Sequence, residues 1–372
     1  MLLKEFEIYK GDGALATIKV PGRTELAGNH TDHQQGRMLA SAIHLNLHAE
    51  YTPNTDDTIR IHSADYEPMV LRINQLSVRP AEFGKPISLV RGVASAFQEL
   101  GLNIGGFDAT VTSSLPIGAG LSSSAAFSVL IARILNNLYN DGKVEDIVLA
   151  RAAHKAENVH FGKPCGITSQ LVCVYGHTLY LDLKENTIER IRADFSEMGL
   201  TMCLTDTGGS HDGLNTSYAR IPADMTYIAN LFDCGVLADV DPAEFRSRGW
   251  DLSNRPVRRA MHFFDENERV PLMRDALKNR NGEEYMRLMN ESGRSSENLL
   301  NNIVTSSTDD TRLLEGLERS ASLLEGKGAW RVHGGGFAGC VQALMPTDYF
   351  PFYRSEMESA FGNGSCFAIR LV

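Results

Sequence analysis

The sequence lacks the features that would place the protein in a membrane or outside the cell. It contains no run of about 18 apolar residues, so no segment could cross a bilayer as a helix. The six cysteines are scattered without a C-x-x-C pair, which argues against a zinc site or a disulfide framework. The first 13 residues contain no long apolar segment and no cleavage signature. We therefore expect a cytoplasmic protein with reduced thiols.

Basic residues are fewer than acidic ones. The chain has 36 lysines and arginines against 46 aspartates and glutamates, which gives a formal net charge of −10. This balance argues against nucleic acid or an anionic membrane as a partner. A small anionic substrate stays open, because the charges close to a site decide what binds there. We expect a monomer or weak homo-oligomer that acts on a small molecule.

The standard phosphate-binding loop G-x-x-x-x-G-K-[ST] is also missing. The pattern G-x-G-x-x-G does occur, at 334–339. A dinucleotide-binding domain needs a strand, a helix and a second strand around this pattern, and too little chain follows Gly339 to supply a whole domain. We therefore favour a tight glycine turn packed beside another loop over a dinucleotide site.

What the chain does have is a glycine-rich stretch at 115–128 that runs into three serines, Ser122, Ser123 and Ser124. Apolar residues at helical spacing follow, so we predict a strand, a glycine turn and a helix that begins at the serines. Exposed N–H groups at a helix start favour an anion such as phosphate, and serines can cap the helix, donate to phosphate or bind a metal. An ordinary capped helix is the alternative, and this stretch alone leaves both open.

The length of 372 residues predicts two domains, and we place the boundary at 1–190 and 191–372 from pattern alone. Two polar, irregular loops interrupt the first part, at 21–33 and 161–170. The expected strands lie at 15–20, 58–62, 69–73, 107–113, 179–183, 188–191, 200–206, 341–344 and 367–372, and alternation within 38–51 indicates a further strand. The expected helices lie at 87–100, 122–139, 144–160 and 349–361, and 218–299 is mainly helical.

Several charged residues near the two loops allow more than one interpretation. Glu157 lies on a helix face, where a glutamate is usually solvated, but it could complete a magnesium site with a serine hydroxyl and phosphate oxygens. Four residues crowd the first loop: Arg23, Glu25, His30 and Asp32. These residues could form salt bridges that stabilise the loop. They could equally form a polyol-binding site.

Four ordered motifs together resemble the galactokinase family of the GHMP kinase superfamily. PGRTELAGNHTDHQQG resembles the family's sugar signature, usually PGRVNLIGEHTDYNGG, and LPIGAGLSSSAAF resembles its nucleotide loop. AENVHFGKPCGITSQ is similar to AEHxFxGxPCGIMDQ, and HGGGFAGC is similar to TGGGFGGC. The resemblance spans nearly the whole chain. It implies a two-lobed α+β fold of the GHMP kinase type, with ATP and sugar in the cleft between the lobes.

The resemblance also implies roles for individual residues. The ATP phosphates would be held by Gly118, Ala119, Gly120, Leu121, Ser122, Ser123 and Ser124. Magnesium (Mg²⁺) would be bound by Ser124 and Glu157, and Arg23 would steady charge at the transferred phosphoryl group. The sugar would be surrounded by Asn29, His30, Asp32, Gly166 and Tyr218. Phosphoryl transfer of this kind depends mostly on positioning and electrostatics.

The chain departs from the family pattern at the position of the catalytic aspartate. That aspartate precedes the glutamine of GIMDQ, and here the position is Ser169. A serine cannot serve as a comparable general base, and loss of positioned acid–base help typically costs about 100- to 10,000-fold in rate. Proximity and charge stabilisation would remain.

Further departures lie in the sugar signature. Asn29 stands where the family has a glutamate that contacts the far hydroxyl end of the sugar, and Glu25 stands where it has an asparagine. Asparagine keeps hydrogen bonding but removes a charge, so a uronic acid would no longer be repelled. The resemblance therefore implies an ATP-dependent kinase that phosphorylates the anomeric hydroxyl of galactose or a related sugar, uronic acids included. The alternative is a catalytically silent sugar- and ATP-binding sensor or regulator.

Overall fold

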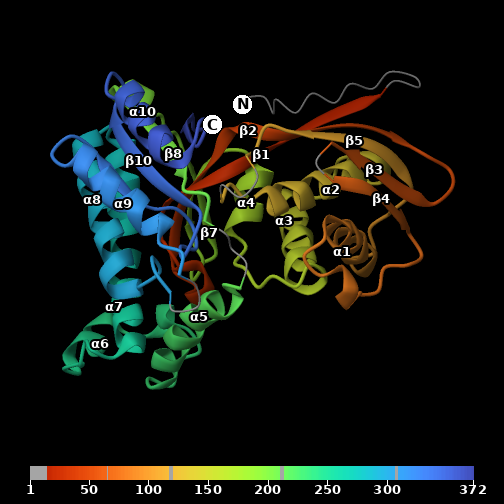
Figure 1. Ribbon diagram of the computed structural model, residues 1–372. Helices are drawn as coiled ribbons and strands as arrows, with labels where there is room; N and C mark the ends of the chain where they lie inside the picture. The colour runs from red at the N-terminus through yellow and green to blue at the C-terminus, as the bar shows by residue number, and fades with distance from the viewer. Residues whose placement is uncertain (1–14, 65, 117–119, 210–212, 306–308) are drawn as a thin grey trace. The chain divides into compact units, whose positions relative to one another are not determined.

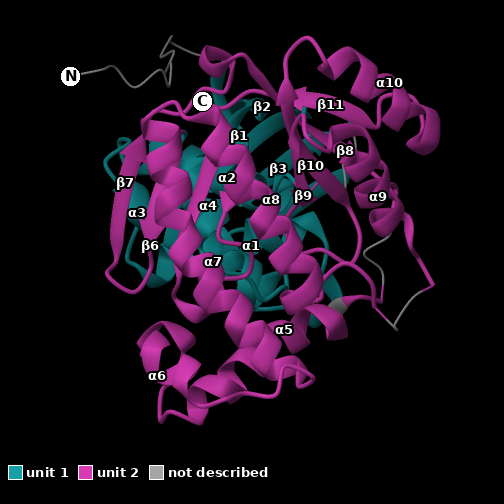
Figure 2. Ribbon diagram, turned by 90° about the vertical axis from the view of Figure 1, so that its left-hand side faces the viewer, with its two compact units in different colours: residues 1–23, 42–117, 121–176 teal, residues 24–41, 118–120, 177–372 magenta. Residues whose placement is uncertain are grey.

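The computed structural model describes residues 15–64, 66–116, 120–209, 213–305 and 309–372. Two compact units, coloured separately in Figure 2, divide the chain. Unit 1 comprises 1–23, 42–117 and 121–176, and unit 2 comprises 24–41, 118–120 and 177–372. The boundary expected near residue 190 stays a prediction about domains. The compact units divide the chain differently, because the early segment 24–41 packs with residues from the second half.

Unit 1 is a sheet covered by helices. Its strands are β1 (Ala16–Ala27, to residue 23 in this unit), β2 (Arg37–Pro53, from residue 42), β3 (Thr58–Ser63), β4 (Tyr66–Arg72) and β5 (Phe107–Ser113). The order β4-β3-β5-β2 has one parallel pair, β3 with β5. The helices α1 (Pro86–Glu99), α2 (Ser123–Tyr139), α3 (Asp146–Lys155) and α4 (Thr168–Tyr175) lie on one face of these strands (Figure 1).

Apolar residues that recur with the period of a strand or of a helix explain why these elements form. In β5, Phe107, Ala109 and Val111 are buried while Thr110 and Thr112 are exposed, as expected for a strand with one covered face. In α2 the apolar positions are nearly all buried, which makes it the central helix of the layer. Short segments of unit 1 include a 3₁₀ helix at Pro80–Glu82 and a π-helical turn at Ala156–His160, whereas the 3₁₀ helix Asp32–Gln34 belongs to unit 2.

Unit 2 holds two groups of strands and most of the later helices. The first residues of β2 pair with β6 (Thr178–Asp182), which pairs with β7 (Thr187–Ile191). A second, antiparallel sheet has the order β11 (Cys366–Ile369), β8 (Leu200–Asp206), β10 (Cys340–Pro346), β9 (Ala329–Val332). The helices of unit 2 are α5 (Asn215–Asn230), α6 (Pro242–Ser247), α7 (Arg255–Lys278), α8 (Gly282–Ser295), α9 (Arg312–Leu324) and α10 (Phe350–Phe361). Its 3₁₀ helices are Ser196–Met198 and Leu237–Asp239, and a π-helical turn lies at Ser296–Leu300.

Buried hydrophobic clusters stabilise unit 2. An aromatic and aliphatic cluster that includes Phe245, Phe263 and Phe264 joins α5, α6 and α7. A second cluster joins the inner face of the β8–β11 sheet to α10 through Cys203, Tyr353 and Cys366. The mixed α+β class predicted from the sequence is confirmed. Among the described residues, the longest apolar helices are all too short or too polar to span a membrane.

Two local predictions need correction, and one alternative is excluded. The first polar loop begins at Gly28 rather than at Pro21, because Thr24, Leu26 and Ala27 are buried and β1 continues through them. The second polar loop ends early, because α4 begins at Thr168. The glycine stretch 334–339 connects β9 to β10 as antiparallel neighbours, so no helix follows it and the dinucleotide-site alternative is excluded.

Candidate functional site

The start of α2 in unit 1 has the strained geometry expected of a phosphate loop. Ser122 is the residue before the helix and adopts a left-handed conformation (φ 59°), which is uncommon for a residue with a side chain. Its hydroxyl makes no cap to the helix backbone, so the capping alternative fails for this serine. The first N–H groups of a helix have no partner within the helix and favour an anion. Of the predicted loop, Gly118 and Ala119 lie outside the described residues.

The remaining loop residues are well placed in the structure. Gly120 also has a left-handed φ of 68°, and a side chain there would lie 3.2 Å from His333 Nδ1, so glycine suits this position. Leu121 is buried, and its carbonyl accepts a hydrogen bond from the Arg23 backbone N–H at 3.2 Å. Ser123 begins α2 and is exposed.

Arg23 and Ser169 lie together in unit 1. The Arg23 Nε donates to Ser169 Oγ at 3.0 Å, and Ser169 Oγ lies 3.1 Å from Ser122 Oγ. The end of β1, the start of α2 and the start of α4 therefore bring an arginine and two hydroxyls to one point. Ser169, at the sequence position of the family's catalytic aspartate, thus offers Arg23 a hydroxyl rather than a carboxylate.

Glu157 is buried rather than solvated, being only 3% exposed. Its Oε1 accepts from Ser124 Oγ at 2.7 Å and its Oε2 accepts from Gln170 Nε2 at 2.7 Å. Lys163 Nζ lies 3.5 Å from the same Oε1, with its side chain 61% exposed. Glu157 belongs to the π-helical turn that follows α3, a feature often found at functional sites.

The Ser124–Glu157 pair fits a magnesium ion that is bound mainly through substrate phosphates. Both groups offer hard oxygen ligands, and Mg²⁺ typically takes one or two protein ligands beside phosphates and waters. No group of three His, Cys, Asp or Glu within the described ranges could enclose a metal alone. The Gln170 amide that donates to Glu157 has a buried Oε1 without a hydrogen-bond partner among the described residues, so the site has unused acceptor capacity.

The segment before α4 places Gly166, the one predicted sugar contact in unit 1. Gly166 follows Cys165, whose backbone N–H donates to Asn158 Oδ1 at 3.1 Å. The Cys165 carbonyl accepts from the His154 ring at 2.9 Å. These bonds connect the segment to α3 and to the turn that carries Glu157. Gly166 lies three residues before Ser169.

The loop 28–33 of unit 2 holds three of the predicted sugar contacts. Asn29 is only 1% exposed. Its Nδ2 donates to Glu25 Oε1 at 3.1 Å and to the Gly334 carbonyl at 2.7 Å. Its Oδ1 accepts from Asn302 Nδ2 at 3.1 Å and from Ser296 Oγ at 3.3 Å. The amide thereby joins β1, the π-helical turn 296–300 and the glycine turn after β9.

A buried carboxylate on α7 anchors this loop from behind. Glu266 is fully buried, and its Oε1 accepts from the backbone N–H groups of Gly28 (3.1 Å) and Asn29 (3.4 Å). Its other oxygen pairs with Arg269. Burial by itself would raise the pKa of Glu266, but Arg269, His262 and Arg331 outweigh it and lower the pKa to about 2. His262, one turn earlier, bonds the Asn29 carbonyl through Nε2 at 2.9 Å.

His30 and His33 form a neutral pair in the loop. His30 Nδ1 lies 3.3 Å from His33 Nε2, and His30 Nε2 lies 3.0 Å from the Gly335 carbonyl. Burial lowers the pKa of His30 to about 4, although the Gly335 carbonyl acts in the opposite direction. Burial and the neighbouring His30 hold the pKa of His33 well below its usual range. Both rings are therefore uncharged near neutral pH.

The other predicted sugar contacts of unit 2 lie close to this loop or to the glycine turn. Asp32 Oδ1 accepts from the His33 backbone N–H at 2.8 Å. Tyr218 OH donates to the Gly336 carbonyl at 2.7 Å, and burial raises the pKa of this phenol. A side chain at Gly335 would lie 2.8 Å from the Tyr218 ring, so only glycine allows this approach. Unit 2 thus gathers Asn29, His30 and Tyr218 around the carbonyls of 334–336.

Sequence reasoning missed the residues that support the loop. Glu266 and His262 lie in the long helical stretch with no motif around them, and Arg331 precedes the glycine turn. Arg331 is 1% exposed, and its Nη2 donates to the Glu25 carbonyl at 2.9 Å. The only signal in the sequence is charge on the buried face of a helix, which cannot be identified before the helix phase is known.

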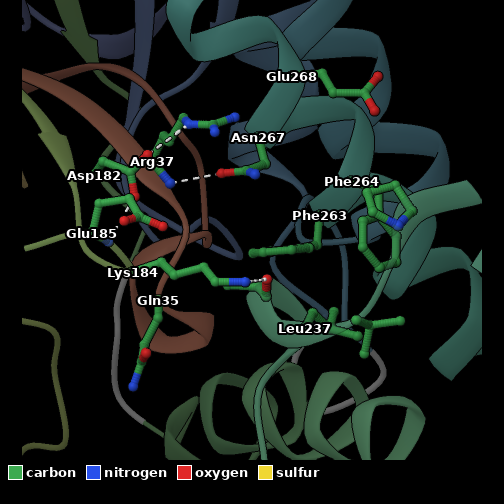
Figure 3. Close-up of a pocket in the computed structure, with 13 residues that line it drawn as sticks. Gln35, Arg37, Asp182, Lys184, Glu185, Leu237, Phe263, Phe264, Asn267 and Glu268 are labelled. Atoms are coloured by element: carbon green, nitrogen blue, oxygen red, sulfur yellow. Dashed lines mark hydrogen bonds and ion pairs between the residues drawn. The ribbon is translucent and has the colours of Figure 1, made fainter. Parts of the chain in front are cut away.

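A separate cavity of about 370 Å³ in unit 2 contains none of the predicted site residues (Figure 3). Phe263, Phe264 and Leu237 form its apolar wall. Both of its cationic side chains have neighbouring partners: Arg37 Nε pairs with Asp182 at 2.9 Å, and Lys184 Nζ donates to the Ala238 carbonyl at 2.7 Å. We therefore do not assign the principal site to this cavity.

Comparison with known proteins agrees with the geometry. The GHMP kinases N-terminal domain matches residues 88–177, and the galactokinase galactose-binding signature matches residues 4–53. A galactokinase of Clostridium tetani is 28% identical over 377 residues, covering 97% of this chain and 91% of that protein. The chain therefore contains a GHMP kinase N-terminal domain and a galactokinase galactose-binding signature. It is similar to this galactokinase along nearly its whole length.

Solved structures show that the fold is the GHMP kinase fold. The structure of Lactococcus lactis galactokinase complexed with galactose superposes with a TM-score of 0.83 at 20% identity, covering 95% of this chain and 93% of that one. The Methanococcus jannaschii mevalonate kinase superposes with a TM-score of 0.69 at 19% identity, covering 97% and 100%. The predicted fold class is thereby confirmed.

Proposed function

We propose that the protein is an ATP- and Mg²⁺-dependent sugar kinase that phosphorylates the anomeric hydroxyl of galactose or a closely related aldose. The observation that supports this most is the convergence in unit 1 of Arg23, Ser122 and Ser169 with the Ser124–Glu157 pair. An anion site at a helix start, a fixed arginine and a hard-oxygen metal site are the parts that phosphoryl transfer requires. The galactose-binding signature supports the sugar as the acceptor.

In this proposal each group of unit 1 has one task. The N–H groups at the start of α2 and the loop serines bind the ATP phosphates. Ser124 and Glu157 hold Mg²⁺, which when bound neutralises charge on the phosphate oxygens. Arg23 stabilises the charge on the transferring phosphoryl group, and its bond to Ser169 fixes its direction.

The sugar oxygen attacks the terminal phosphorus, a new O–P bond forms and ADP leaves. Ser169 cannot take the hydroxyl proton as a carboxylate would, because the pKa of serine is far too high. The proton leaves to a phosphoryl oxygen or to water. This is chemically acceptable because the transition state of phosphoryl transfer is loose, with little need for deprotonation before the O–P bond forms. The expected price is a low turnover rate.

The side chains of unit 2 provide no charge argument for a uronic acid. The sequence suggested that Asn29 removes a negative charge from the sugar site. In the structure that charge is nearby, because Glu25 Oε1 lies 3.1 Å from Asn29 Nδ2. The charge argument for a uronic acid therefore loses its basis, and galactose and its neutral relatives are the proposed substrates.

The test is ADP release coupled to a panel of aldoses, uronic acids and amino sugars, with Ser169→Asp beside the parent. We expect slow, sugar-dependent ADP formation with galactose, and a rise of about 100- to 10,000-fold in kcat for Ser169→Asp, because a positioned base is restored. Ser169→Asn is the matched control, since it has a similar shape without a base.

Two results would contradict the proposal. Equal rates with and without sugar for both proteins would exclude sugar kinase activity. Sugar binding in a calorimeter without turnover by either protein would show a silent sensor instead.

A further inference from the structure

We infer that this protein does not read the hydroxyl farthest from the anomeric carbon of its sugar through position 29, and so accepts sugars that lack this hydroxyl. The inference rests on the proposed function, which it makes more specific. In the family pattern the glutamate at this position contacts that end of the sugar. In galactose the group concerned is the 6-hydroxyl.

The first step is the hydrogen-bond capacity of Asn29. A side-chain amide has two donor hydrogens and an oxygen that accepts two bonds. Both donors of Asn29 are used, on Glu25 and the Gly334 carbonyl, and both acceptor positions are used, by Asn302 and Ser296. The amide is also buried. It has no donor or acceptor left for a substrate.

The second step is the exchange of residue types between positions 25 and 29. Compared with the family pattern, the carboxylate and the amide have changed places, and the structure shows them bonded to each other at 3.1 Å. Glu25 is 8% exposed, and its Oε1 lies 3.6 Å from Arg331 Nη2, which is buried. The carboxylate is thus committed to an ion pair and to Asn29. The pair acts as one positioning unit that fixes the loop against the glycine turn.

The third step is the effect of a fully paired Asn29 on the choice between galactose and a sugar that lacks the 6-hydroxyl. A site built to hydrogen-bond a substrate hydroxyl rejects the analogue without it by about 10⁴- to 10⁵-fold, because its own buried polar group is left unpaired. Asn29 stays fully paired whether or not the hydroxyl is present. Removing that hydroxyl from the substrate therefore leaves no unsatisfied group at position 29, and the large penalty does not arise.

The experiment compares galactose with 6-deoxygalactose as acceptors for the intact protein. We expect the two kcat/KM values to lie within about tenfold of each other. A preference for galactose of about a hundredfold or more would overturn the inference. In the exchange variant Glu25→Asn/Asn29→Glu, we expect the preference for galactose to increase at least tenfold, mainly through KM. An unchanged ratio in that variant would also contradict it.

Melting temperatures test the positioning unit independently of turnover. Asn29→Glu alone places two buried carboxylates and the Gly334 carbonyl around one point, so we expect a large decrease. The exchange variant should recover part of that loss, because one donor faces one carboxylate again. If the decreases in melting temperature for the two single substitutions simply added in the exchange variant, Glu25 and Asn29 would not act as one positioning unit. Asn298→Glu, an exposed asparagine on the π-helical turn, is the matched control, with little expected change.

These two measurements separate the inference from the proposed function. If no sugar is phosphorylated by the parent or by Ser169→Asp, the proposed function fails and the specificity statement fails with it, while the melting temperatures still show whether Glu25 and Asn29 act as a unit. If galactose is phosphorylated and 6-deoxygalactose is not, the proposed function holds and only this inference is wrong.

Discussion

The cluster of Arg23, Ser122 and Ser169 in unit 1 and the loop 28–33 in unit 2 differ in how completely their polar groups are buried and hydrogen-bonded. In unit 1, Ser122 and Ser169 are only partly buried and are joined to Arg23 by two hydrogen bonds. In unit 2, the backbone and side chain of Asn29, a residue only 1% exposed, are bonded from α7, from the π-helical turn and from the glycine turn.

The proposed function accounts for this difference. Groups that bind a phosphate for one reaction cycle need donors that are free to change partners. A loop that presents a fixed surface to a sugar gains from having every polar group paired, because an unpaired buried group is costly. Substitutions in unit 2 should therefore reduce stability, and substitutions in unit 1 should reduce turnover.

The largest stability effect is expected at Glu266. Glu266→Gln keeps the shape but removes the charge that balances Arg269, so we expect a loss of about 3–5 kcal/mol in the free energy of unfolding. Denaturant unfolding measures it. Glu268→Gln, on the exposed side of α7, is the control, with a change below about 1 kcal/mol. Equal losses of unfolding free energy in Glu266→Gln and Glu268→Gln would contradict the claim that the buried anchor of unit 2 determines its stability.

Acid should weaken the same anchor. The pKa of Glu266 is about 2 in the folded protein against 4.5 for the ordinary side chain, so its ionised form stabilises the fold above pH 4.5. That contribution is lost as the pH falls from about 4.5 to about 2, and amounts to roughly 3 kcal/mol. Unfolding curves across this range should show the loss in the parent and much less of it in Glu266→Gln. Parallel curves for the two proteins would refute it.

A double-mutant cycle on Ser124→Ala and Glu157→Gln should move turnover more than stability. The hydroxyl donates to a buried carboxylate, and a hydrogen bond to a charged group contributes about 1.5–3 kcal/mol. We expect each single variant to lose most of the Mg²⁺-dependent rate and the pair to lose little more. Ser95 and Glu99, an exposed pair 3.2 Å apart, form the matched cycle, with no expected effect on rate. Additive rate losses at 124 and 157 would show that the two do not share a metal.

The smallest effect is expected at Lys163. Its ammonium lies 3.5 Å from the Glu157 carboxylate and competes with a cation there. Because the lysine is largely exposed, Lys163→Met should change the binding of Mg²⁺·ATP by about 0.2–1 kcal/mol, in favour of tighter binding. Calorimetry measures it, with Lys143→Met as the exposed control. Weaker binding by Lys163→Met would show that the lysine assists the phosphates instead.

Local pattern in the sequence predicted much of this fold. The limits of β5 and β8 agree with the predicted strands, because their apolar residues follow a clean period. The extension of β1 through Thr24 and Glu25 could not be predicted, because polar residues fill a buried strand there and find their partners only in distant segments. The same reason hid Glu266 and His262. The family resemblance identified position 29, but its saturated amide depends on Asn302 and Ser296, which no local pattern links to it.

The sequence separation of 238 residues between Gly28 and Glu266 has a consequence for synthesis of the chain. A ribosome completes the sugar-signature loop long before it makes the helix that anchors it. Fragments that stop before residue 266 would carry this loop without the carboxylate that accepts from the Gly28 and Asn29 N–H groups. This anchor can form only after most of the chain has emerged.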